Sequence, residues 1–166
     1  KDSLVTAISA RWILEKTAPQ LKENGFILGL IHNIGSLFLV QSMPRLYSQA
    51  MPETQEGEVL QYEAEERLLG VNHLQVGSCM AKRWGFPDTL TTPIAYHHYP
   101  DKLPHDGSLL NLTQTLHFAA KFSEFFHSRE TGFQLAAIDH LLRIYRLDEH
   151  LMIDDHFYRK LDLHIH

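Results

Sequence analysis

The chain has 166 residues, of which 44% are hydrophobic and 21% charged, with a formal net charge of −5 at pH 7. This balance fits one soluble globular domain, excludes a disordered or fibrous chain, and gives no general electrostatic reason to bind nucleic acid or an anionic membrane. The single cysteine, Cys79, excludes an intrachain disulfide framework and a thiolate-rich zinc site, and it favours a reducing cytoplasm.

The first part of the chain predicts helices that proline and glycine separate. Residues 3–16 carry apolar side chains at near-helical spacing, and Pro19 ends this helix. The most hydrophobic stretch, residues 25–40, is shorter than the ~20 apolar residues of a membrane-spanning helix, and polar residues interrupt it. We expect a buried core helix over about residues 21–42. It should bend or break around Gly35, because glycine weakens a helix interior by about 1 kcal/mol relative to alanine.

Further helices are expected along the rest of the chain. A short helix over residues 44–50 and a glutamate-rich helix over residues 56–69 come first, and Gly70 ends the second. Asn72 is a good N-cap for the next helix, which runs to Trp84. The remaining helices are expected from Pro87 to the pair His97 and His98, and over residues 108–126, 135–145 and 148–161. No strand pattern or repeat competes with an all-α fold.

Four of the twelve histidines are predicted to point inward from separate helices. His32 lies in the apolar helix, His73 lies at a helix start, and His97 and His98 lie at a helix end. Neutral imidazole is a good ligand for zinc, iron or nickel, and histidines that converge from separate helices build metal sites in helical folds. The alternative for each is a core histidine that is hydrogen-bonded to a carbonyl or carboxylate.

Three motifs in register resemble the HDOD branch of the HD-type phosphohydrolase superfamily. The family patterns G-L-L-H-D-I-G-x-L-x-L, E-x-x-x-x-G-x-x-H-x-x-V-G-x-x-x-x-x-x-W-x-x-P and I-x-x-H-H-x-P are similar to GLIHNIGSLFL, EERLLGVNHLQVGSCMAKRWGFP and IAYHHYP here. Order and spacing agree over about residues 3–122. The resemblance implies one HD-like helical bundle of about seven to nine helices over residues 1–166. It also implies a fragment of a longer bacterial signalling protein, without the additional helical N-terminal half of HDOD regions.

The resemblance also assigns metal positions that can be compared one by one. HD-type hydrolases bind one or two divalent metals through histidines and aspartates, and His73, His97 and His98 match their positions. The first histidine falls on Asp2, the His-Asp doublet falls on His32 and Asn33, and the distal aspartate falls on Ala120. Either Glu65 or Glu66, just before His73, is a candidate to orient a histidine, with a surface salt bridge as the alternative.

The substitutions at Asn33 and Ala120 remove the charge that a dinuclear centre needs. Two divalent ions bring four positive charges, which carboxylates bridge and neutralise, whereas neutral imidazoles supply none. We therefore expect no cofactor. One ion of iron, zinc, nickel or manganese on His32, His73, His97 and His98, with Asp2 adding a carboxylate, is the alternative.

The main functional hypothesis is thus a non-catalytic signalling module that acts through other domains or a small ligand. Its expected partners are signalling proteins, the missing N-terminal half or a second copy, since an uncovered half leaves an apolar surface. A metal-dependent phosphohydrolase acting on a nucleotide or cyclic dinucleotide is the competing hypothesis. Nucleic-acid binding is disfavoured, because the only basic cluster, Arg143, Arg146, Arg159 and Lys160, has acidic neighbours.

Overall fold

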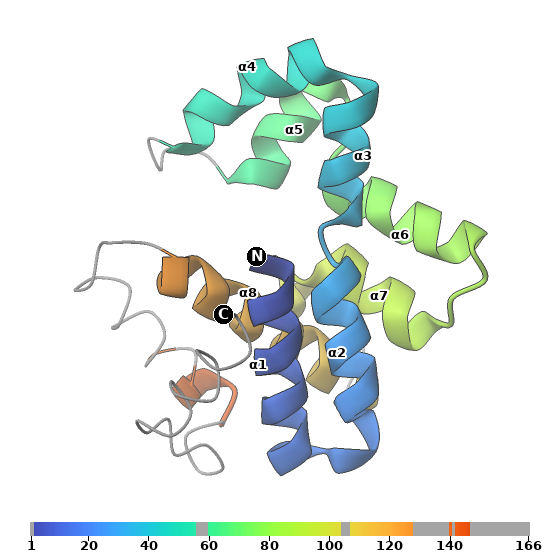
Figure 1. Ribbon diagram of the computed structural model, residues 1–166, viewed down its shortest axis with the longest axis vertical. Helices are drawn as coiled ribbons and strands as arrows, with labels where there is room; N and C mark the ends of the chain where they lie inside the picture. Colours follow the sequence, from blue (N-terminus) through green and yellow to red (C-terminus); the bar gives the residue numbers. More distant parts are fainter. Residues whose placement is uncertain (1, 56–59, 104–106, 128–139, 141, 147–166) are drawn as a thin grey trace.

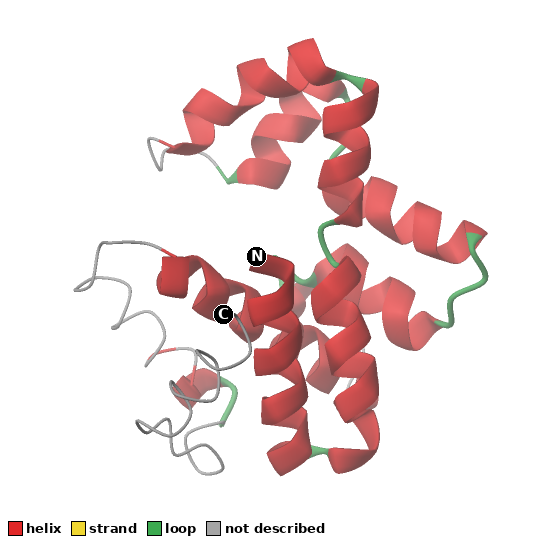
Figure 2. Cartoon of the chain, viewed as in Figure 1, coloured by secondary structure: helices red, strands yellow, loops and turns green. Residues whose placement is uncertain are grey.

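The protein is described here by a computed structural model, which covers residues 2–55, 60–103, 107–127, 140 and 142–146. Within these residues the chain forms eight α-helices and two short 3-10 helices and contains no strand (Figures 1 and 2). The all-α prediction and the expected number of helices are confirmed. Of the helix predicted over residues 135–145, the structure describes residues 140 and 142–145, which are helical at 140 and 142–144. The helix predicted over residues 148–161 lies outside the described residues.

Four helices build the apolar core. They are α1 (Asp2–Thr17), α2 (Lys22–Ile31), α7 (Asp88–Tyr96) and α8 (Ser108–His127), and the 3-10 helix η1 (Pro19–Leu21) joins the first two. α1 packs along both α2 and α8, and α7 packs on α8 and α2. The buried side chains between them include Leu14, Leu28, Leu90, Ile94, Leu112 and Leu116. This core fixes the ends of α2 and α7, where three of the candidate histidines lie.

Three of the other four helices extend away from this core, toward the upper part of Figure 1, whereas the fourth, α6 (His73–Arg83), lies beside α7 and adds Ala81 to the core. The three are α3 (Ile34–Ser42), α4 (Pro44–Gln55) and α5 (Gln61–Leu69). α3 packs on α6, α4 packs on α5, and α6 packs on α7, which connects the two groups. A short 3-10 helix, η2 (Pro100–Lys102), follows α7.

The predicted break in the apolar helix is real, but it lies at His32 and Asn33 rather than around Gly35. Asn33 has φ −95° and ψ 15°, which ends α2 and starts α3 in a new direction. Gly35 lies inside α3 at a backbone contact with α6, where an added Cβ would collide with the carbonyl oxygen of His73 and lie 2.7 Å from the amide nitrogen of Gly77. The glycine is therefore required for close packing of two helices rather than for a bend.

The prediction of a buried core helix holds for only one side of this stretch. Residues Pro19–Ser42 are long and apolar enough to cross a membrane by length and composition, and 33% of their most apolar 18-residue segment is buried. Leu28 and Leu39 are buried, whereas Ile27, Leu30, Leu37, Phe38 and Val40 are each more than 40% exposed. The turn at His32 and Asn33 divides the stretch, which weakens the case for a membrane-spanning helix. The exposed side is an apolar surface on α2 and α3.

The start of α6 forms as the sequence predicts. Gly70 ends α5 in the left-handed conformation, with φ 75°. The side chain of Asn72 then accepts a hydrogen bond from the Gln75 amide at 3.0 Å, and the Asn72 amide donates to the Gln75 side chain at 3.1 Å. This reciprocal capping fixes the first turn of α6 and thereby the position of His73.

Candidate metal centre

The four histidines singled out in the sequence all lie at helix ends. His32 directly follows α2, His73 is the first residue of α6, His97 directly follows α7, and His98 comes next. His32, His73 and His97 are buried, and His98 is partly buried. The ends of three helices therefore bring imidazole rings from distant parts of the chain to one place.

Backbone carbonyls hold two of these rings through the Nδ1 atom. His32 Nδ1 lies 2.9 Å from the carbonyl oxygen of Gly29, and His97 Nδ1 lies 3.0 Å from that of Ile94. A carbonyl can only accept a hydrogen bond, so Nδ1 carries the proton in both rings. The Nε2 atom of each neutral ring consequently carries a free lone pair, which is the form that binds a metal.

A buried carboxylate holds the third ring. Glu65 Oε2 lies 2.6 Å from His73 Nδ1 and 2.7 Å from the backbone nitrogen of His73, so it accepts two hydrogen bonds from one residue. Its other oxygen accepts from Gln61 Nε2 at 2.8 Å. Burial raises the pKa of Glu65, but the hydrogen bonds from His73 and Gln61 outweigh it and leave the pKa below its ordinary value. Glu65 is therefore an anion that orients His73.

The resulting geometry offers a set of metal ligands. His73, His97 and His98 each present one ligand atom, and these atoms lie within 4.8 Å of one another. His73 Nε2 and His97 Nε2 are buried and have no hydrogen-bond partner among the residues that the structure describes. A buried polar atom without a partner costs about 1–3 kcal/mol, and coordination of an ion would satisfy both. We call these three residues the histidine cluster.

His32 borders the histidine cluster without being one of its three members. Its ring meets that of His97 edge to face, with centroids 5.3 Å apart. Burial lowers the pKa of His32 to about 4. Burial, followed by the nearby His73 and Lys121, lowers the pKa of His98 to about 2, and burial with His98 lowers that of His97 well below its ordinary value. These three rings are therefore neutral at pH 7, as metal ligands must be.

A pocket of about 180 Å³ opens beside these rings. His32, His97 and His98 line one part of it, and its other lining residues are polar or small: Asp2, Thr6, Asn33, Gln61, Ala120, Ser123 and Glu124. Lys121, next to the pocket, forms an ion pair with Glu124 at 2.8 Å. The pocket gives a small polar molecule access to the histidine cluster.

The other site residues predicted from the sequence differ in where they lie: some line the pocket, one contacts a histidine of the cluster, and one is exposed. Asp2, Asn33 and Ala120 line the pocket, and Glu65 rather than Glu66 contacts a cluster histidine. Glu66 is exposed, and it instead accepts a hydrogen bond at 2.9 Å from Nδ2 of Asn72, the residue before α6.

Three further residues at the site were not predicted. Gln61 supports Glu65, Glu124 lines the pocket one helical turn after Ala120, and His117 Nδ1 lies 2.6 Å from the carbonyl oxygen of His97. Helical phase is the one sequence signal that could have identified Glu124, since residues 120 and 124 share a face of α8. Nothing in the sequence pattern singles out Gln61 or His117.

The donor set fits one divalent ion better than two. Three imidazole nitrogens and an orienting carboxylate are what mononuclear zinc sites use. Within the described residues, the histidine cluster is the one group of three or more ligand side chains close enough to share an ion. Asn33 and Ala120 carry no carboxylate, and the two carboxylates that line the pocket, Asp2 and Glu124, are exposed, so the donor set fits a dinuclear centre less well.

Comparison with known structures supports the fold. Over 87% of its length the chain resembles a protein of Shewanella amazonensis that is provisionally named a phosphohydrolase, with a TM-score of 0.72 and 19% identity. It also resembles an HDOD domain protein of unknown function from Geobacter sulfurreducens over 92% of its length, with a TM-score of 0.68 and 22% identity. The MmoQ response regulator from Methylococcus capsulatus matches over 88%, with a TM-score of 0.67 and 18% identity.

These relatives are longer than the chain itself. The chain covers 52% of the Shewanella protein, 62% of the Geobacter protein and 58% of MmoQ. Over 82 residues, or 49% of its length, it is 26% identical to an uncharacterized protein of Treponema pallidum, of which it covers 15%. Residues 1–100 match the HDOD domain, which is more than half of the sequence. The chain therefore belongs to the HDOD domain family.

Proposed function

We propose that the chain is a regulatory HDOD module whose histidine cluster holds a single divalent transition-metal ion, and that it does not hydrolyse phosphoesters. The observation that carries the proposal is the pair of buried, unpartnered Nε2 atoms on His73 and His97. Glu65 and the carbonyl of Ile94 hold the opposite side of each ring, so both lone pairs are fixed in direction before an ion arrives.

The charge of the site supports a role other than hydrolysis. A dinuclear phosphohydrolase needs bridging carboxylates to neutralise two ions, and Asn33 offers a neutral amide in the doublet. The buried carboxylate, Glu65, is committed to His73 and Gln61. When bound, one ion would crosslink the start of α6 to the end of α7, and so would stabilise their relative position.

Metal analysis tests this proposal. The purified protein should contain close to one equivalent of zinc, iron, nickel or manganese, and zinc should raise its melting temperature. His73→Ala should abolish both effects, whereas His140→Ala, which removes an exposed imidazole, should leave them unchanged. Metal content that is negligible, or equal in the His73→Ala variant and the wild type, would contradict the proposal.

A metal-dependent phosphohydrolase is the second candidate, because two carboxylates, Asp2 and Glu124, line the same pocket as the histidines. They are candidates to replace the charge that the doublet lacks. The test is hydrolysis of bis-(p-nitrophenyl) phosphate and of a cyclic dinucleotide with added manganese. Activity above the metal-free blank that Asp2→Asn and Glu124→Gln both remove would favour this candidate over the first.

The apolar surface on α2 and α3 supports a module that works through a partner. Leu37 is 59% exposed and Phe38 is 45% exposed, and both lie in a stretch without charged residues between Glu23 and Arg45. We propose that another region of a signalling protein covers this surface, as expected for a patch of this kind. Light scattering distinguishes the alternative of a second copy: a dimer that Leu37→Glu converts to a monomer would show self-association instead.

A further inference from the structure

The peptide that joins His97 to His98 is held from outside the histidine cluster. His97 follows the last turn of α7, where backbone carbonyls have no partner within the helix. His117, on α8, brings its Nδ1 atom to 2.6 Å from the carbonyl oxygen of His97, and because that oxygen can only accept, Nδ1–H donates. One hydrogen bond therefore orients the peptide plane between two members of the cluster.

That plane matters more for His98 than for His97. The His97 ring has its own backbone partner, the carbonyl of Ile94 at 3.0 Å. The His98 ring is placed by ring contacts, with centroid distances of 4.3 Å to His97, 5.1 Å to His73 and 5.6 Å to Tyr62. Within the described part of the chain, no hydrogen bond holds the His98 ring in this way. Rotation of the peptide between the two histidines would therefore displace His98.

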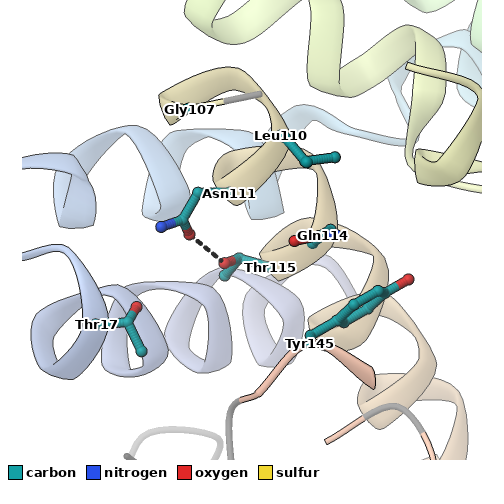
Figure 3. A pocket seen from close by; sticks show the side chains of 7 residues that line it. All are labelled: Thr17, Gly107, Leu110, Asn111, Gln114, Thr115 and Tyr145. Carbon is teal, nitrogen blue, oxygen red and sulfur yellow. Dashed lines mark hydrogen bonds between the residues drawn. The ribbon is translucent and has the colours of Figure 1, made fainter. Parts of the chain in front are cut away.

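The ring of His117 is in turn held by an aromatic residue that follows α8 in the chain. The aromatic ring of Tyr145 meets it edge to face, with centroids 6.0 Å apart and an angle of 80° between the planes. Tyr145 lies against α8 beside Gln114, at a pocket of about 260 Å³ that Thr17 of α1 also lines (Figure 3). The contacts Tyr145 to His117 and His117 to His97 form a continuous chain from this pocket to the histidine cluster.

We propose that His117 is a positioning residue for the histidine cluster, and that Tyr145 couples this cluster to the segment around residues 142–146. The inference rests on the proposed metal site, because coupling is defined by a change in metal affinity. Coupling free energies are reciprocal, so an ion that tightens the cluster also stabilises the Tyr145 contact, and displacement of Tyr145 weakens metal binding by the same factor. His117 does not coordinate the ion in this arrangement.

Zinc affinity, measured by competition with a chromophoric chelator, tests the proposal. His117→Ala should weaken zinc binding by about tenfold, the lower end of the range for residues that orient metal ligands. His117→Asn should keep most of the wild-type zinc affinity, because the Asn amide nitrogen occupies the place of Nδ1. His117→Gln places its amide one bond further away and should bind zinc as weakly as His117→Ala. Tyr145→Ala should weaken zinc binding by a smaller factor than His117→Ala does. Tyr145→Phe keeps the aromatic ring and should bind zinc as the wild type does.

The exposed His140 provides a matched control, since His140→Ala also removes one imidazole. Wild-type affinity in folded His117→Ala would overturn the positioning role, and wild-type affinity in Tyr145→Ala would overturn the coupling. Equal losses in His117→Asn and His117→Gln would also refute the hydrogen bond as the cause, even if the alanine variant fails to fold.

The two proposals can fail separately. If the wild-type protein binds no zinc, the proposed metal site is wrong, and imidazole NMR spectra of the metal-free protein then decide the role of His117. Its ring should be the Nδ1–H tautomer, and the His98 signals should shift in His117→Gln and return in His117→Asn. Unchanged His98 signals in all variants would overturn the positioning role.

Discussion

Replacement of Glu65 by glutamine should destabilise the protein far more than the change of one atom suggests. The carboxylate is fully buried and accepts three hydrogen bonds, two from His73 at 2.7 and 2.6 Å and one from Gln61 at 2.8 Å. In Glu65→Gln one oxygen becomes an NH₂ group. If it faces His73 it meets two N–H donors, which cannot accept. If it faces Gln61 it meets the amide nitrogen of Gln61, and this clash is relieved only when Gln61 turns its amide and gives up its present hydrogen bonds to Tyr47 and Ser36.

The magnitude follows from these contacts. Loss of charge assistance costs about 1 kcal/mol for each of the two His73 hydrogen bonds, and a buried donor without an acceptor adds about 1–3 kcal/mol. We expect a loss of about 3 kcal/mol in the free energy of unfolding, measured by urea denaturation. Zinc affinity should fall about tenfold or more, because His73 loses its orienting partner.

The control is Glu63→Gln, an exposed glutamate on the same helix, which should change stability by less than about 0.5 kcal/mol. If Glu65→Gln lies within about 1 kcal/mol of the wild type, the carboxylate is not the buried anchor that its hydrogen bonds indicate.

Three other perturbations have defined outcomes. Gly35→Ala should cost about 3 kcal/mol in urea denaturation, because its Cβ would collide with the His73 carbonyl, and Gly77→Ala should cost less, since its nearest new contact is a side-chain methyl at 3.2 Å. In metal-free protein the pKa of His32 is about 4 when folded and about 6.5 when unfolded, so between these values only the unfolded chain binds the proton. His32 alone should therefore lower stability by up to about 3 kcal/mol from pH 6.5 to 4, in addition to the contributions of His97 and His98, and His32→Asn should show a shallower decline in thermal melts. Asn33→Asp should raise bound manganese per chain in elemental analysis, since it adds an anionic oxygen beside His32, and an unchanged content would contradict this.

Much of the fold was predictable because its signals are local. The cap at Asn72 and the stop at Gly70 follow from backbone chemistry within a few residues, and both are confirmed. The break near Gly35 was misplaced because a glycine in a helix has two explanations, a bend or a close neighbour. Only the packing of α3 on α6 shows which one applies.

The candidate site was predictable in part for the same reason. Motif spacing identified the cluster histidines, and proximity to His73 suggested Glu65, but no local pattern separates Glu65 from Glu66. The structure separates them by burial, since Glu65 faces inward and Glu66 outward. The contribution of His117 depends on a contact between residues 20 positions apart, which helical periodicity alone does not reveal.

The backbone contacts on either side of the turn at His32 and Asn33 also bear on how this site could change over evolutionary time. Gly29 lies directly against the backbone of Ala7, and Gly35 lies directly against that of His73, so α2 and α3 are fixed on both sides of the turn without help from a ligand. Side chains in the turn can then be exchanged while the scaffold keeps its shape. In a protein of this architecture, a single substitution in the turn therefore changes which groups line the pocket, while the exposed apolar face of α2 and α3 stays the same.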